Sequence, residues 1–116
     1  MKKIATPYLE DIYTSIVHIE TYTTLEKMEE SKFLESTLVQ DAVTRRLEII
    51  GEATKRLEAD FKEQYDQIPW RKMTGLRDIL IHEYDEVDLH QVWLVLVQDL
   101  PVLKTQINDL LKQGIK

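Results

Sequence analysis

The segment Leu38–Ala59, LVQDAVTRRLEIIGEATKRLEA, carries the clearest periodic pattern in this chain of 116 residues. Its apolar and small residues recur every three or four positions, at Val39, Val43, Leu47, Ile50, Thr54 and Leu57. Because an α-helix makes one turn in about 3.6 residues, this spacing predicts a long helix with one buried face. Gly51 lies mid-segment, where glycine costs about 1 kcal/mol relative to alanine, so we expect another helix to cross closely there.

Similar spacings predict three more long helices, and no alternating strand pattern competes with them. They cover residues 6–25, 70–84 and 88–112. Thr6 before Pro7 is typical of an N-cap followed by proline at the first helical position. Asp88, with a glutamine three residues later, resembles a capping box. The sequence therefore predicts an all-α fold, an antiparallel four-helix bundle with short additional helices.

The shorter segments and the helix faces are also open to prediction. Residues 23–36 are expected to connect two helices through one short helical turn, and Asp60 to cap another through Tyr65. Pro101 falls inside the last helix and predicts a kink, or a restart near Asp99. Outside the central segment, the residues expected to face inward include Phe33, Leu34, Met73, Leu76, Ile79, Leu80, Trp93, Leu96, Val97, Leu100, Leu103, Ile107 and Leu110.

Composition restricts the class of protein. The length predicts one domain, residues 1–116. The absence of cysteine excludes disulfides, thiolate metal sites and cysteine nucleophiles, and it suits a cytoplasmic protein. The start has no apolar run that would indicate a signal peptide, and Val92–Val97 is too short to span a bilayer, so we expect no membrane association.

The net charge of −6 argues against nucleic-acid binding by bulk electrostatics, but the charge is unevenly distributed. Residues 1–44 and 78–116 each carry a local charge of −4, whereas residues 45–77 carry +2. This least acidic third contains Arg45, Arg46, Lys55, Arg56, Arg71 and Lys72. A run of charge usually marks a solvated helix face, so the pattern alone assigns no function.

The third long helix ends in the segment Arg77-Asp-Ile-Leu-Ile-His82-Glu-Tyr84. An arginine can stabilise a phosphate oxyanion, and a histidine can transfer protons near neutral pH. On one regular helix, two residues five apart lie about 140° around the axis and about 7.5 Å along it, so they would not reach the same phosphate. Either the helix ends or tightens before His82, or residues from two chains form one site by symmetric pairing. Asp78 is four residues before His82, where a carboxylate would favour protonated imidazole and fix its orientation.

Arg77-x4-His82-x-Tyr84 resembles the Arg-x4-6-His signature of HEPN-domain ribonucleases, in the form found in HepT-like toxins. Other blocks resemble the same family: Ala42–Ala53, Ile68-Pro-Trp70, Gly75–Tyr84, Val92-Trp93 and Asp99-Leu-Pro101. The resemblance implies an all-helical homodimer with composite sites at its interface, acting as the endoribonuclease toxin of a toxin–antitoxin pair. It implies catalytic roles for Arg77 and His82, with Asp78 at the polar position that commonly follows the arginine.

The expected chemistry needs no metal and no cofactor. His82 would help remove the proton of an RNA 2′-hydroxyl, and Arg77 would stabilise the charge that develops on the phosphorane, leaving a 2′,3′-cyclic phosphate. The basic residues listed above would be candidate RNA contacts. Glu86 and His90 have helical spacing, but no third ligand accompanies them, so a metal site is not expected.

The resemblance also implies a protein partner. An MntA-like minimal nucleotidyltransferase antitoxin would transfer AMP onto Tyr84, and the two proteins would form a hetero-oligomer. The added bulk and negative charge would then occupy the place of the RNA phosphate and inhibit cleavage. Asp85 and Glu86 would either weaken RNA binding or serve recognition by the antitoxin.

Simpler interpretations remain open from the residues alone. Arg77 and His82 would then belong to surface ion pairs with Asp78 or Glu83, and Tyr84 would be an amphipathic residue at a helix end. The protein would be a non-catalytic helical binding subunit of a nucleotidyltransferase complex, or a purely structural dimer.

Overall fold

The computed structural model describes residues 4–25 and 27–114, and within them the secondary structure is helical with no strand. The elements in chain order are α1 (Thr6–Leu25), α2 (Glu30–Glu35), α3 (Thr37–Arg56), α4 (Ala59–Gln64), α5 (Trp70–His82), the 3₁₀ turn η1 (Tyr84–Glu86), α6 (Leu89–Leu94), the π-helical segment η2 (Val95–Asp99) and α7 (Leu100–Lys112). The predicted all-α fold of four long helical regions is confirmed.

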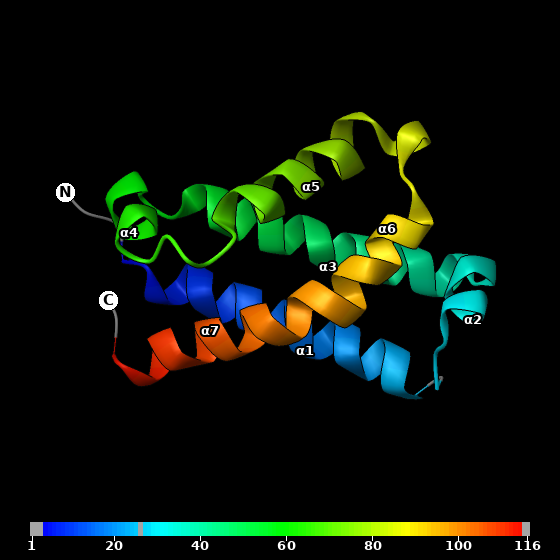
Figure 1. Cartoon of the computed structure of the whole chain (residues 1–116), viewed down its shortest axis with the longest axis horizontal. Coiled ribbons are helices and arrows are strands. Elements are labelled where there is room, and N and C mark those ends of the chain that lie inside the picture. Colours follow the sequence, from blue (N-terminus) through cyan, green and yellow to red (C-terminus); the bar gives the residue numbers. More distant parts are fainter. Residues whose placement is uncertain (1–3, 26, 115–116) are drawn as a thin grey trace.

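Helix α3 is the centre of the architecture. It packs against α1 on one side and α5 on another, and α7 packs against α1. Figure 1 shows the result: α3 runs through the middle, α1 and α7 lie below it, and α5 lies above it. All six residues predicted for the inner face of α3 are buried. The helix that the sequence marks most clearly is therefore the one that holds the others together.

The helix boundaries follow from local chemistry. The Ser36 hydroxyl accepts a hydrogen bond from the Val39 amide and caps α3. The Asp88 carboxylate accepts hydrogen bonds from the amides of His90 and Gln91, which confirms it as the N-cap of α6. Thr6 is the first residue of α1 rather than its cap. Similarly, α4 begins at Ala59, so Asp60 lies within its first turn instead of capping it.

Pro101 explains the irregular segment in the last long helix. The chain remains helical from α6 into α7, but it widens to a π-helical segment over Val95–Asp99, immediately before the helix that contains the proline. Proline lacks an amide hydrogen and clashes with the preceding turn, and a π-helical turn is one way for a helix to accommodate it. Pro101 lies in the first turn of α7, where no intrahelical donor is needed, so the predicted irregularity near Asp99 is confirmed.

Three residues predicted to face inward are exposed. Leu34 is 43% exposed because α2 is only six residues long and its neighbour Phe33 fills the available core position. Ile79 is 41% exposed because its side of α5 faces a groove of about 500 Å³ between α5 and α6. Val97 is 47% exposed and borders a hollow beside η2. In each case the helical spacing was predicted correctly, but no neighbouring element covers that face of the helix.

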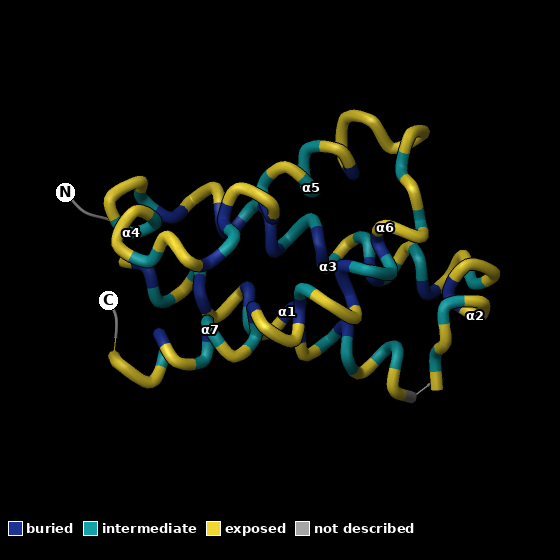
Figure 2. The backbone as a smooth tube through the Cα atoms, in the orientation of Figure 1, coloured by how far each residue is buried: buried dark blue, intermediate teal, exposed yellow. Residues whose placement is uncertain are grey.

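The end of α5 and the turn that follows stand away from the rest of the molecule. In Figure 1, α5 diverges from α3 toward its C-terminal end, and Figure 2 shows mostly exposed residues there. Residues 81–86 are all exposed. The last part of the sequence motif is therefore presented to solvent. Within residues 4–25 and 27–114, no helix combines the length and apolar character that crossing a bilayer requires.

Candidate active site

The site is built where α5 crosses α3 at Gly51. A Cβ atom at this position would lie 2.1 Å from the Cβ of Arg77 and 2.9 Å from the carbonyl oxygen of Met73. Both distances are far below van der Waals contact, so only glycine allows the two helices to approach this closely. The close crossing predicted from Gly51 is confirmed, and it packs the stem of Arg77 against α3.

The guanidinium of Arg77 lies between two carboxylates. Its Nη2 forms an ion pair with Glu52 Oε2 at 3.1 Å, and its Nη1 donates to Asp78 Oδ1 at 3.0 Å. The Arg77 side chain is only 18% exposed, whereas both carboxylates are nearly half exposed. Its Nε is buried and has no hydrogen-bond partner within the described chain. Arg77 is thus a mostly buried cation whose head is held at the surface.

Two further cations complete this cluster. Lys55 Nζ lies 3.1 Å from Asp78 Oδ1, and Arg56 Nε lies 3.4 Å from Glu52 Oε1. We call Glu52, Lys55, Arg56, Arg77 and Asp78 the charge cluster. Three cations and two carboxylates leave it with a net charge of +1. The charge cluster itself is therefore slightly positive even though Arg77 is paired.

Asp78 is bound to Arg77 and Lys55. The hydrogen bond from Arg77, followed by that from Lys55, lowers the pKa of this carboxyl below its usual value. Asp78 therefore stays ionised at neutral pH. Through these contacts Asp78 orients Arg77. Its predicted effect on the protonation and orientation of His82 stays a prediction.

His82 is the last residue of a continuous α-helix. The Glu83 amide still donates to the Ile79 carbonyl at 2.9 Å, which is the α-helical pattern. The expectation that the helix ends or tightens before His82 is therefore wrong, because regular hydrogen bonding extends past it. Within one chain, Arg77 and His82 lie on different sides of α5. Tyr84, in η1, is 77% exposed just beyond.

A groove of about 500 Å³ lies beside Arg77, between α1, α3 and α5. Its lining brings Arg45 and Arg56 together with Arg77, and Tyr8 and Ile81 add apolar surface. The other candidate RNA contacts lie elsewhere. Lys55 holds Asp78, and Arg46 is half-buried on α3. Arg71 and Lys72 line a second groove at the start of α5, and Lys72 Nζ lies 2.7 Å from Asp99 Oδ2.

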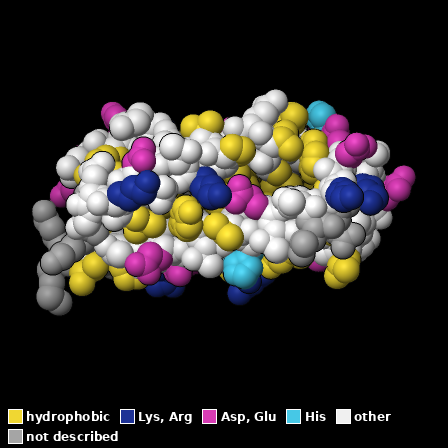
Figure 3. All heavy atoms as spheres, turned by 90° about the horizontal axis from the view of Figure 1, so that it is seen from below, with side chains coloured by type: hydrophobic (Ala, Val, Ile, Leu, Met, Phe, Trp, Pro, Cys, Tyr) yellow, Lys and Arg dark blue, Asp and Glu magenta, His cyan; other side chains and the backbone are white. Residues whose placement is uncertain are grey.

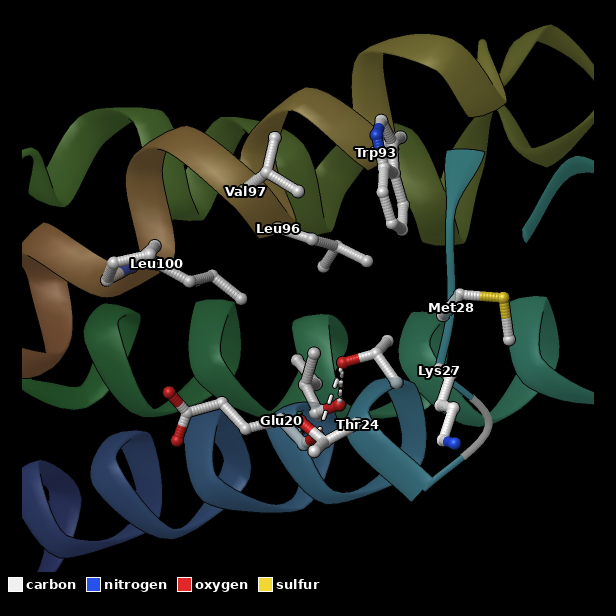
Figure 4. A pocket seen from close by; sticks show the side chains of 11 residues that line it. Glu20, Thr24, Lys27, Met28, Trp93, Leu96, Val97 and Leu100 are labelled. Carbon is white, nitrogen blue, oxygen red and sulfur yellow. Dashed lines mark hydrogen bonds between the residues drawn. The ribbon is translucent and has the colours of Figure 1, made fainter. Parts of the chain in front are cut away.

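Other surfaces of the molecule carry none of the predicted site residues. A hollow of about 350 Å³ lies between the end of α1 and the η2 region, with mainly apolar walls formed by residues such as Met28, Trp93 and Leu100 (Figure 4). Figure 3, which views α1 and α7 from below, shows positive and negative side chains interspersed on that face. In the described chain, no group of three or more His, Asp or Glu side chains is placed to hold a metal ion.

The sequence pattern did not identify Glu52 as a site residue. The available signal was its place directly after Gly51. A residue next to a close helix crossing must meet the crossing helix, and here it meets the arginine of the motif.

These observations define a class of protein. It is an all-helical chain with an arginine held at a helix crossing and an exposed histidine at the end of the same helix. The model of the HepT-like family, described as "Ribonuclease HepT-like", matches residues 12–110. The chain therefore belongs to the HepT-like ribonuclease family.

Individual relatives agree with this assignment. The chain is 44% identical over 112 residues to "Probable ribonuclease HepT" of Thermococcus cleftensis, covering 97% of this chain and all of that protein. It is also 44% identical over 113 residues to "Gamma-glutamylcyclotransferase and putative RNase" of Methanocaldococcus jannaschii. That match covers 97% of this chain, which spans only 50% of the relative. A "Putative RNase" of Caldanaerobacter subterraneus is 32% identical, with 96% and 97% of the two chains covered. No solved structure matches the chain significantly.

Proposed function

We propose that this protein is a metal-independent endoribonuclease that cleaves RNA through attack of a 2′-hydroxyl on the adjacent phosphate. One observation carries the proposal. In a member of the HepT-like ribonuclease family, the arginine of the Arg-x4-His motif is fixed beside a groove, and the histidine is exposed at the end of the same helix. The proposed catalytic residues are Arg77 and His82, with Asp78 in support.

The active site is proposed to form between two copies of the chain. Because α5 is continuous, the two side chains of one chain are separated by about 140° around the helix axis and cannot share a phosphate. In a two-fold symmetric dimer, Arg77 of one protomer would face His82 of its partner, and each dimer would hold two such sites. Ile81, which is 38% exposed and lines the same groove as Arg77, supplies apolar surface for such pairing.

The reaction proceeds by proton transfer and charge stabilisation. The neutral imidazole of His82 accepts the 2′-hydroxyl proton while O2′ forms a bond to phosphorus. Arg77 stabilises the negative charge on the phosphorane oxygens, the bond to the 5′-oxygen breaks, and that oxygen takes up a proton. The products are a 2′,3′-cyclic phosphate and a 5′-hydroxyl. General acid–base catalysis of this kind contributes about 10²- to 10⁴-fold.

RNA is proposed to run along the groove beside Arg77. Arg45 and Arg56 line that groove, beside the carboxylates of Asp11, Glu48 and Glu52, and are proposed to contact the neighbouring phosphates. Arg46, Lys55, Arg71 and Lys72 are proposed as more distant contacts. Because the whole chain is acidic, binding would depend on these local contacts more than on overall attraction.

The protein is further proposed to act as the toxin of a toxin–antitoxin pair, with an MntA-like nucleotidyltransferase as antitoxin. Tyr84 is 77% exposed, two residues after His82, and is the proposed acceptor of AMP. The added phosphate would repel the RNA phosphate at the same site. Incubation with the nucleotidyltransferase and ATP should add the mass of AMP and inhibit cleavage, and Tyr84→Phe should escape both effects. Inhibition of Tyr84→Phe would reject this acceptor.

The test of the proposed function is a cleavage assay in EDTA. Wild-type protein should cut RNA, whereas the folded Arg77→Ala and His82→Ala variants should each be inactive. Mixing the two inactive variants under conditions of subunit exchange should restore activity. Each mixed dimer has one intact site of two, and about half of randomly formed dimers are mixed, so about a quarter of wild-type activity is expected.

Each result of this assay has a defined meaning. Cleavage that persists in both single variants would exclude the proposed site, whereas partner binding without any cleavage by the wild-type protein would favour a non-catalytic binding subunit. Inactive single variants without recovery on mixing, when mixed dimers are detected by differential tags, would reject a site shared between protomers.

A further inference from the structure

We propose that Glu52 is a positioning residue that aims the guanidinium of Arg77 into the groove, which extends the proposed ribonuclease function and depends on it. Glu52 belongs to α3 and Arg77 to α5, and the two side chains join at 3.1 Å across the helix crossing. Asp78 also binds Arg77, but it is the next residue on the same helix. Of the two carboxylates that hold Arg77, Glu52 belongs to α3 itself, whereas Asp78 is linked to α3 only through Lys55.

The hydrogen-bonding capacity of arginine leaves room for a phosphate. A guanidinium has five N–H donors, two on each Nη and one on Nε. Asp78 accepts a hydrogen bond from Nη1, Glu52 forms an ion pair with Nη2 at 3.1 Å, and Nε is buried. At least one hydrogen on each Nη therefore remains for substrate oxygens. The two carboxylates orient the guanidinium of Arg77 without occupying all of its N–H donors.

Charge balance keeps Glu52 from repelling RNA. Its Oε1 faces Arg56 at 3.4 Å while its Oε2 faces Arg77, so the carboxylate lies between two cations. Lys55 likewise offsets the negative charge of Asp78. The negative charges of Glu52 and Asp78 are therefore each offset by a cation of the charge cluster, while Asp11 and Glu48 also line the groove.

Fixed orientation matters most in the transition state. A charge-stabilising donor is effective when it is already aimed at the place where charge develops, because it then needs no reorganisation during the reaction. Gly51 fixes the stem of Arg77, and Glu52 fixes its head. Loss of Glu52 should leave the cation present but poorly aimed, so the rate of the chemical step falls more than the affinity for RNA.

The experiment compares three substitutions at this position on the full chain. Glu52→Gln keeps the size and one acceptor oxygen, Glu52→Asp keeps the charge with a shorter reach, and Glu52→Ala removes both. We expect Glu52→Ala to lower kcat about 10-fold with KM changed less than about 3-fold. Glu52→Gln should lose less, and Glu52→Asp should recover part of the activity. Glu35→Ala, which removes an exposed carboxylate from the end of α2, is the control and should leave kcat unchanged.

A double variant separates positioning from a general effect on the fold. If Glu52 acts through Arg77, Glu52→Ala should cause a smaller fold-loss of kcat in an Arg77→Lys variant that keeps measurable cleavage than in the wild type. Thermal unfolding identifies the variants that remain folded. If Glu52→Ala is unfolded, the near-isosteric Glu52→Gln replaces it in the comparison. The inference is overturned if Arg77→Ala is inactive but a folded Glu52→Gln variant has an unchanged or increased kcat. It is also overturned if the Glu52 substitutions change KM alone. Full activity of Arg77→Ala would instead reject the proposed function itself.

Discussion

Gly51 is the residue on which the geometry of the site depends. Two opposing effects act on a substitution to alanine there. Alanine favours a helix by about 1 kcal/mol over glycine, but overpacking at a well-packed contact costs about 1–3 kcal/mol. At Gly51 a Cβ atom would meet the Cβ of Arg77 and a backbone carbonyl oxygen, neither of which can rotate away. The steric cost should therefore outweigh the gain in helix propensity.

We expect Gly51→Ala to lower the free energy of unfolding by about 1 kcal/mol and to reduce RNA cleavage, because α5 and Arg77 must move outward. Gly75→Ala is the matched control, since a Cβ there would meet nothing within 4 Å. It should gain about 0.5–1 kcal/mol from helix propensity alone. Denaturant unfolding of both variants makes the comparison. Equal stabilisation of the two would contradict the close crossing.

At the scale of elements, an ion pair joins the short helix α2 to α6. The Nδ1 of His90 is hydrogen-bonded to Oε1 of Glu30, and both side chains are substantially exposed. The hydrogen bond and charge of Glu30, with a smaller contribution from Asp88, raise the pKa of His90 above its ordinary value. Folding therefore favours protonated His90, and the stabilisation depends on pH.

The direction of this dependence follows from the raised pKa. The stabilisation from His90 should be fully present below the unfolded pKa of about 6.5, provided that Glu30 is ionised, and it should be lost as the pH rises through the folded pKa. We expect wild-type protein to exceed His90→Gln in stability near pH 5.5, with the difference shrinking by about pH 9. Thermal unfolding across this range measures it. A difference that does not change with pH would show that this pair does not couple folding to protonation.

Helix α5 shows what a periodic pattern can and cannot predict. The spacing identified the helix, and Met73 and Leu80 are buried as expected. Ile79 was predicted to be buried and is exposed, because the pattern marks an apolar face but does not say which neighbour covers it. The helix continues through His82 and ends at its C-cap Glu83, so that Tyr84 of the motif already lies in η1 rather than in the helix predicted to reach it.

For the whole molecule, the sequence predicted what depends on neighbours along the chain. The buried face of α3, the cap at Asp88 and the irregularity before Pro101 each follow from local rules. The contact between Glu52 and Arg77 does not, because it depends on the angle at which two helices cross. The roles of Arg77, His82 and Tyr84 stay predictions, since they concern chemistry and pairing beyond one chain.

The divergence of α5 from α3 also bears on how such a protein can change over generations. The part of α5 that carries the histidine lies outside the packed layers of α1, α3 and α7 (Figure 1). Substitutions in the exposed residues 83–86 therefore cost little in folding. New specificities are accessible through this short stretch, while the interior that keeps the chain folded is inherited unaltered.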